Sequence, residues 1–317
     1  MRVIFMGTPD FAVNALKALA SDDNIDVVLT VTQPDKPVGR HGTLTPPDVK
    51  VCAEELGIPV FQPVKVREPE AVDKLKSYSP DLIVVAAFGQ ILPAEILDMP
   101  PLGCINIHAS LLPKYRGAAP IQWAILNGDD KAGVTIMKMD VGLDTGDIIS
   151  SRFISIGREY TGGTLFDALS ELGAELLMDT IPHIVDGTAT YTPQDESLAT
   201  KVGMIKKSMG EINFTEDAFV IDRKVRAFNP WPAAYTKLGG KMLKIWDTVP
   251  YGKDSFPKAK LQNAAAGTVL LADDTLAVAC GDGTVLEIAE LQLEGKKRMN
   301  SADFLRGVKI KEGDILG

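Results

Sequence analysis

Two polar side chains interrupt an apolar run in the first half of this 317-residue chain, and their types could form a reaction centre. In the stretch CINIHA, Asn106 and His108 alternate with Ile105 and Ile107. Successive side chains of a β-strand point to opposite faces, so the amide and the imidazole would share one face. An amide can donate to a carbonyl oxygen that gains negative charge, and an imidazole can do the same or carry a proton. Because isolated histidines are more often structural, spacing alone still favours a buried, hydrogen-bonded Asn–His pair.

A second candidate is the acidic stretch DVGLDTGD at 140–147, directly after a strand-like run. We expect this loop at the same carboxyl-end level of the sheet, where a carboxylate could orient His108 and stabilise its protonated form. Metal binding competes with this interpretation, although the stretch lacks the spacing of a calcium loop and contains no His or Cys. A plain turn whose aspartates cap the backbone is the third possibility. The sequence does not choose among them.

The stretch MGTPDF at 6–11 follows the first strand-like run, where nucleotide-binding loops occur. It has one glycine and matches neither GxGxxG nor GxxxxGK[ST], which disfavours a nicotinamide dehydrogenase. We therefore expect Asp10 to act as the N-cap of a helix over 11–20, with Phe11, Ala15, Leu16 and Leu19 on its buried face.

The elements that must position these residues alternate along the first 190 residues. The predicted strands are 2–7, 26–33, 81–89, 105–109 and 134–140, and the predicted helices are 11–20, 47–56, 119–128 and 165–179. This order predicts an α/β domain with a doubly wound, mostly parallel sheet. Ligands of such sheets bind beyond the carboxyl ends of the strands, where the strand order reverses.

The pattern changes after residue 190. A polar segment without a clear period is followed by a helix-like run and then by short β-rich runs at roughly ten-residue spacing, which suggests a small β-barrel of the OB-like kind. We predict a catalytic domain at 1–189, a linker at 190–208 and a C-terminal β-barrel domain at 209–317.

Composition and charge limit the class of protein. The chain is 45% hydrophobic and 24% charged, as in ordinary globular proteins. Its three cysteines fit neither a metal site nor a disulfide framework, the apolar N-terminal run is too short for a signal peptide, and 82–88 is too short to span a membrane. We expect a cytoplasmic protein.

The charge is distributed unevenly along the chain. Residues 201–317 carry 18 Lys/Arg and 15 Asp/Glu, a net +3. Residues 1–200 carry the remaining 15 Lys/Arg and 27 Asp/Glu, a net −12. This asymmetry would suit one-sided approach to a polyanion, although random variation between domains explains it equally well.

Several segments together resemble one family. NIHASLLPKYRGAAPIQWAILNGD and GVTIMKMDVGLDTGDI are similar to the central segment of the methionyl-tRNA formyltransferases, and MGTPDFAV, TQPDKPVGR, AFNPWPAAY and LQLEGKKRM are similar to other landmarks in the same order. The Asn-x-His and Asp core by itself resembles all formyltransferases that use 10-formyltetrahydrofolate. AFNPWP and the C-terminal domain narrow the resemblance to the tRNA enzymes.

The resemblance implies a reaction and a set of site residues. The catalytic residues would be Asn106, His108 and Asp144, and the reaction would transfer formyl from 10-formyltetrahydrofolate to the methionine of initiator Met-tRNA without a metal. The folate would contact the family's binding stretch and a pterin pocket, here Ser110, Leu111, Leu112, Pro113, Phe88, Gly89, Ile91 and Leu92.

The resemblance also implies tRNA contacts, at Arg40 in the loop 33–44 and at Lys206 and Lys207 in the linker. The chain departs from the family here, because the loop has fewer lysines and Met204 occupies a usual lysine position. We expect a monomer. Two alternatives stay open: formyl transfer to a nucleotide-linked sugar amine, and a folate- or RNA-binding protein without turnover.

Overall fold

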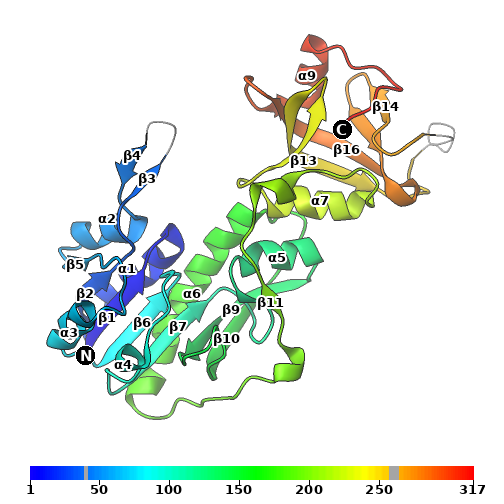
Figure 1. Cartoon of the computed structure of the whole chain (residues 1–317). Helices are drawn as coiled ribbons and strands as arrows, with labels where there is room; N and C mark the ends of the chain where they lie inside the picture. Colours follow the sequence, from blue (N-terminus) through cyan, green and yellow to red (C-terminus); the bar gives the residue numbers. More distant parts are fainter. Residues whose placement is uncertain (39–41, 257–263) are drawn as a thin grey trace. The chain divides into compact units, whose positions relative to one another are not determined.

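The computed structural model describes residues 1–38, 42–256 and 264–317, which form two compact units. Unit 1 comprises Met1–Pro120, Lys131–Ser155 and Phe166–Val202 (Figure 1). Unit 2 comprises Ile121–Asp130, Ile156–Leu165 and Gly203–Gly317. The boundaries 1–189, 190–208 and 209–317 assume contiguous segments and remain predictions.

Unit 1 is built on a seven-stranded sheet in the order β10-β9-β7-β6-β1-β2-β5. Its pairings are parallel except at β9, which runs antiparallel to both of its neighbours. This confirms the prediction of a mixed α/β domain with a mostly parallel sheet. The strands are β1 (Arg2–Gly7), β2 (Asp26–Val31), β5 (Val60–Phe61), β6 (Leu82–Ala86), β7 (Cys104–His108), β9 (Lys131–Lys138) and β10 (Ile148–Ser155).

The strand order reverses at β1, which has β2 on one side and β6 on the other. Every residue of β6 is buried, as expected for a parallel strand covered on both faces. Beyond the carboxyl ends of β1 and β6, the hydroxyl of Thr8 donates to the backbone carbonyl of Phe88 at 2.9 Å. This hydrogen bond joins the two loops at the position where such sheets bind ligands.

The helices of unit 1 are α1 (Val13–Ala20), α2 (Asp48–Glu55), α3 (Pro69–Ser77), α4 (Ala94–Leu97) and most of α6 (Gly162–Val185). Two of them, α3 and α4, were not predicted from the sequence, and α6 is longer than the predicted helix at 165–179. The prediction that Asp10 caps a helix is wrong. Asp10 begins a separate 3-10 turn, η1 (Asp10–Ala12), and α1 has Ala12 at its N-cap without a side-chain hydrogen bond. The carboxylate of Asp10 accepts from the adjacent N–H of Phe11 instead.

Helix α6 determines which face of β7 is available for chemistry (Figure 1). A Cβ added at Gly173 of α6 would lie 3.0 Å from a methyl carbon of Ile107, so α6 packs closely on the face that Ile107 presents. Asn106 and His108 alternate with Ile107 and therefore point to the opposite face. The local alternation predicted this arrangement.

Unit 2 is a smaller antiparallel β domain, in agreement with the predicted fold class. Its sheet has the order β12-β13-β16-β15-β14, with β17 paired to β16. The strands are β12 (Ala234–Leu238), β13 (Lys241–Tyr251), β14 (Val269–Ala272), β15 (Leu276–Ala279), β16 (Val285–Leu293) and β17 (Met299–Asn300). The helices are α5 (Pro120–Asn127), α7 (Ala218–Ala227) and α9 (Ser301–Gly307). The carboxylate of Asp217 caps α7 by accepting from Phe219 at 2.8 Å.

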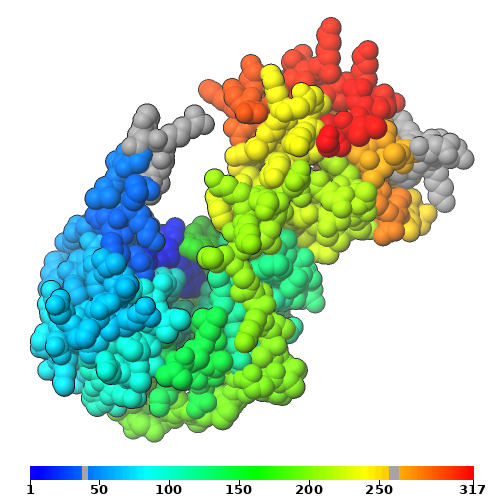
Figure 2. Space-filling model, viewed as in Figure 1, coloured from blue at the N-terminus to red at the C-terminus, as the bar shows by residue number. Residues whose placement is uncertain are grey.

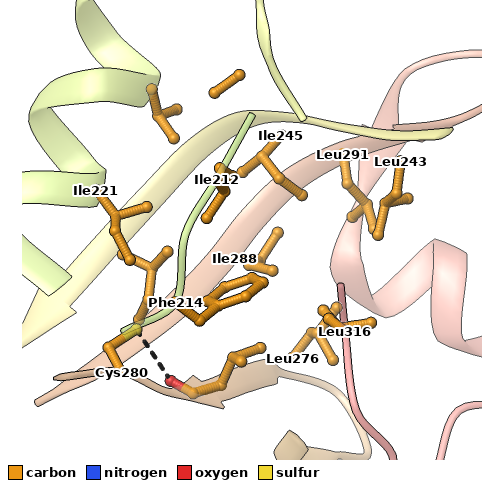
Figure 3. Close-up of a cluster of buried hydrophobic side chains, with 14 of the residues drawn as sticks. Ile212, Phe214, Ile221, Leu243, Ile245, Leu276, Cys280, Ile288, Leu291 and Leu316 are labelled. Carbon is orange, nitrogen blue, oxygen red and sulfur yellow. Dashed lines mark hydrogen bonds between the residues drawn. The ribbon is translucent and has the colours of Figure 1, made fainter. Parts of the chain in front are cut away.

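Figure 3 shows the core of unit 2, in which apolar side chains from α7 and the sheet converge. Ile221 of α7 meets Phe214 and strand residues such as Ile245 and Ile288. Each of these four side chains is buried, which removes their apolar surface from water and stabilises the unit. Across the described residues, no helix combines the length and the apolar character needed to cross a membrane.

Candidate active site

Asn106 and His108 lie two residues apart on β7, with very different surroundings. His108 is only 6% exposed, and its Nε2 lies 3.0 Å from the backbone carbonyl oxygen of Tyr115. Since a carbonyl only accepts, Nε2 carries the hydrogen of this bond. Asn106 is half-buried, and within the described part of the chain its side chain makes no hydrogen bond to another residue. The ring of His108 is therefore held in place, whereas the amide of Asn106 can donate to a substrate.

Asp144 reaches this pair from an unexpected direction. Because β9 is antiparallel to β7, the loop after β9 begins beside Ile105, at the amino end of β7. The expectation that this loop lies at the carboxyl-end level is therefore wrong. The loop nevertheless brings one carboxylate oxygen of Asp144, Oδ2, to 3.7 Å from Nδ1 of His108. This distance is too long for a direct hydrogen bond, but it lets the carboxylate attract the ring whenever the imidazole is protonated.

The loop 139–147 is held in a tight conformation by its own polar groups. Asp140 accepts from the N–H of Gly142 at 2.9 Å and from the hydroxyl of Thr145 at 2.7 Å. Asp144 itself has a φ of +54°, in the left-handed region that non-glycine residues rarely adopt. A Cβ on Gly146 would lie 1.8 Å from the carbonyl oxygen of Lys138, so this position has no room for a side chain. The aspartates thus serve two purposes, with Asp140 forming the turn and Asp144 facing the imidazole.

The loop after β7 contains four of the predicted folate residues. The hydroxyl of Ser110 donates to the carbonyl of Lys114 at 2.6 Å, and the N–H of Leu112 donates to Thr135 of β9 at 3.1 Å. Both residues are buried, whereas Leu111 and Pro113 are partly exposed. The buried pair anchors the loop, and the other two lie at its surface.

The loop after β6 contains the other four predicted folate residues, and they divide in the same way. Phe88 and Leu92 belong to a hydrophobic core of unit 1, whereas Gly89 and Ile91 are exposed. Ile91 is 79% exposed, which is unusual for a large apolar side chain.

The predicted tRNA residues that the structure describes are exposed lysines, unlike the buried His108. Arg40 lies outside the described residues. Lys206 and Lys207 are exposed on unit 2, at the start of the short turn η3 (Lys207–Gly210), and Met204 is exposed nearby in sequence.

Sequence reasoning missed an ion pair next to the site, between the buried Arg116 and the exposed Glu196. Arg116 is 1% exposed and donates to Gln194 and, through both terminal nitrogens, to Glu196. Its hydrogen bond with Glu196 is the main cause of a raised pKa of the guanidinium, and the same bond lowers the pKa of the Glu196 carboxyl. The polar composition of 190–208 suggested a linker and concealed these contacts. The glutamine and glutamate at 194 and 196, within a segment that shows no period, gave no signal of these contacts.

A cavity of about 540 Å³ in unit 1 is formed by other residues, on η1, α1, α2 and α6. Asp10 lines this cavity, and its pKa is raised, first by burial and then by the nearby carboxylate of Asp48. No group of three or more His, Cys, Asp or Glu side chains within the described ranges could hold a metal ion. Cys104 begins β7, and burial raises the pKa of its thiol to about 12, so it carries no thiolate at neutral pH.

The comparisons with known proteins decide the family. Residues 1–181 match the formyl transferase family, and residues 204–309 match the formyl transferase C-terminal domain. The chain belongs to the formyl transferase family. It is 50% identical over 316 residues to the methionyl-tRNA formyltransferase of Agathobacter rectalis, and the aligned region covers 99% of each chain.

Two solved structures of formyltransferases share the fold. The methionyl-tRNA formyltransferase from Clostridium thermocellum is 21% identical, with a TM-score of 0.55 over 78% of this chain and 93% of that one. The N-formyltransferase from Helicobacter canadensis in complex with folinic acid and dTDP-3-aminofucose is 20% identical, with a TM-score of 0.66 over 90% and 98%.

Proposed function

We propose that this formyltransferase moves the formyl group of 10-formyltetrahydrofolate to the α-amino group of methionine on initiator Met-tRNA. The products are N-formylmethionyl-tRNA, which serves translation initiation, and tetrahydrofolate. The observation that carries the proposal is the approach of Asp144 to His108, two residues from a free Asn106 amide on the same face of β7. Full-length similarity to methionyl-tRNA formyltransferases supports the choice of acceptor.

Asn106 stabilises the formyl oxygen as the amine attacks. The lone pair of the amine forms the new bond to the formyl carbon, and negative charge develops on the formyl oxygen. A side-chain amide without an internal hydrogen bond can donate to that oxygen without first breaking another contact. Such a donor contributes about 2.7–4 kcal/mol to the transition state, a factor of about 10² to 10³ in rate.

His108 transfers the proton, and Asp144 supports it. One proton leaves the attacking amine, and one must reach the nitrogen from which the formyl group departs. Nε2 of His108 is held by the Tyr115 carbonyl, so its Nδ1, on the side of Asp144, is the nitrogen that exchanges protons, directly or through a water. The carboxylate of Asp144 keeps the ring oriented and stabilises it when it is charged.

The folate would be held by the exposed members of the two predicted loops. Gly89, Ile91, Leu111 and Pro113 are the residues with accessible surface, and Phe88, Leu92, Ser110 and Leu112 would support them from within the core. An exposed Ile91 suits the flat face of a pterin. When bound, 10-formyltetrahydrofolate supplies a formyl group already activated by its nitrogen leaving group, so the chain itself needs no metal.

For the tRNA, we propose that Arg40, Lys206 and Lys207 contact phosphates. Arg and Lys side chains supply the sequence-independent part of nucleic-acid affinity, which weakens as salt rises. The net +3 of residues 201–317 is consistent with this role. We propose a cytoplasmic monomer as the working form.

The test is a substrate panel with purified protein and 10-formyltetrahydrofolate. We expect formylation of charged initiator Met-tRNA and much slower formylation of elongator Met-tRNA. Transfer to a nucleotide-linked amino sugar but not to tRNA would favour the sugar enzymes instead. Binding of folate or RNA without turnover on any amine would contradict an enzymatic role.

A further inference from the structure

We propose that Gln194 is a positioning residue, which holds the Asp144 loop against His108 and is itself held by Arg116 and Glu196. The proposal rests on the proposed function in one respect, because it takes Asp144 to be part of the catalytic group. All of the residues concerned belong to unit 1.

Gln194 contacts the Asp144 loop through both hydrogens of its side-chain amide. Its Nε2 donates to the backbone carbonyl of Asp144 at 2.9 Å and to that of Gly146 at 2.7 Å. An amide nitrogen has two donors, so Gln194 uses both of them on a single loop. No other residue type of the same length offers two donors and one acceptor without a charge.

Arg116 and Glu196 determine where this amide points. Nε of Arg116 donates at 3.0 Å to Oε1 of Gln194, which leaves only Nε2 to face the loop carbonyls. The terminal nitrogens of Arg116 bind the two carboxylate oxygens of Glu196 at 3.0 and 2.6 Å. A bidentate pair on a buried guanidinium has a specific geometry, so the orientation of Arg116 is well defined.

The segment that contains Gln194 also binds the loop after β7, through its backbone and through Thr200. We call residues 194–202 the strap. Its C-terminal part, β11 (Lys201–Val202), pairs in parallel with β8 (Arg116–Gly117), and the hydroxyl of Thr200 accepts from the N–H of Tyr115 at 2.8 Å. Tyr115 supplies the carbonyl that binds His108, and Gly117 supplies an N–H that binds Asp144.

The strap therefore bridges the two loops that position the catalytic group. Figure 2 shows the segment after α6 on the surface, in yellow-green, and most of its side chains are exposed. Because the strap is largely exposed and its contacts with the two loops are hydrogen bonds, it supports the site rather than a hydrophobic core. The left-handed φ of +54° at Asp144 is unfavourable for a non-glycine residue, so the loop depends on contacts of this kind to keep its conformation.

The experiment uses two substitutions of similar size in the full-length protein. Gln194→Glu keeps an acceptor for Arg116 but replaces the donors by carboxylate oxygens, and Gln194→Met removes donors and acceptor without adding a charge. We expect both to lower kcat by about tenfold or more, because a shift of catalytic groups by about 1 Å reduces the rate steeply. The KM for Met-tRNA and the KM for 10-formyltetrahydrofolate should change little. Amide hydrogen exchange of residues 140–147 should become faster in both.

The control is Asp195→Ala in the same strap, because among the described residues the Asp195 carboxylate accepts from Ser197 alone and makes no hydrogen bond to the Asp144 loop. We expect its kcat to equal that of the wild type. Adding Gln194→Met to Asp144→Asn should cost little further rate, since Gln194 acts through Asp144. Wild-type kcat or unchanged loop exchange in Gln194→Met would overturn the proposal. An inactive wild-type protein would contradict the proposed function, whereas faster loop exchange in the variant would still support the positioning role.

Discussion

The backbone N–H of Gly117 donates to the carboxylate of Asp144 at 2.7 Å, and the same oxygen faces the imidazole of His108. One carboxylate oxygen thus connects the loop after β7 with the loop after β9, which are 27 residues apart in the chain. A Cβ on Gly117 would lie 2.5 Å from the carbonyl oxygen of Val202, so the contact requires glycine at this position. The N–H of Gly117 fixes the carboxylate beside Nδ1 of the ring, while the Tyr115 carbonyl binds its Nε2.

Replacing the imidazole tests its role directly. We expect His108→Ala to lower kcat by at least about 10² while the affinity for tRNA stays close to that of the wild type. Steady-state kinetics and a tRNA-binding titration measure the two quantities. His183→Ala is the matched control, because His183 is exposed near the end of α6, where its ring hydrogen-bonds to Thr188. Near-normal turnover in His108→Ala would assign His108 to the core instead.

Removing the charge at Asp144 separates electrostatics from loop geometry. Asp144→Asn can still accept from Gly117, but it no longer stabilises a charged imidazole. We expect kcat to fall by roughly 10², with the melting temperature nearly unchanged.

Asp140→Asn is the companion variant, since its amide oxygen can still accept from Gly142 and Thr145. We expect it to retain most of the wild-type rate. Equal losses in the two variants would show that the loop needs negative charge in general rather than a carboxylate at position 144.

Space at Gly146 provides a test of the loop conformation. We expect Gly146→Ala to reduce the free energy of unfolding by about 1–3 kcal/mol and to lower kcat, because the added methyl group collides with the Lys138 carbonyl. Gly203→Ala is the control, as a Cβ there has no neighbour within 4 Å. Chemical denaturation and kinetics of both variants measure the effect. A stable and fully active Gly146→Ala protein would contradict the tight loop.

Acid should loosen the strap. The hydrogen bond from Arg116 lowers the pKa of Glu196 below its ordinary value of 4.5. A carboxyl with a lowered pKa in the folded state stabilises that state above its unfolded pKa, and this contribution is lost as the pH falls through the folded pKa. We expect the wild type to melt at a higher temperature than Glu196→Gln at pH 7, and the difference to shrink below about pH 4.5. A difference that is constant from pH 7 to pH 3.5 would exclude this ion pair as its source.

Local patterns were enough for much of the fold. Buried parallel strands such as β6 are uniformly apolar, and a helix such as α1 has a clear period, so the α/β domain was predictable although α3 and α4 were missed. The same-face placement of Asn106 and His108 followed from the alternation of a single strand, which needs no knowledge of its neighbours. Short elements escaped prediction, because two-residue strands such as β8 and β11 have no periodicity.

The family, the alternation of strands and helices and the shared face of Asn106 and His108 were predictable, since each depends on motifs or on residues close in the chain. The route by which Asp144 reaches His108, and the hydrogen bonds of Gln194 to the Asp144 loop, became visible in the folded unit alone. The direction of β9 is a property of its pairing with β7, and the contacts of Gln194 join segments about 50 residues apart. Hydrogen bonds between such distant segments leave no periodic trace in the sequence, because they depend on where the whole unit folds each loop.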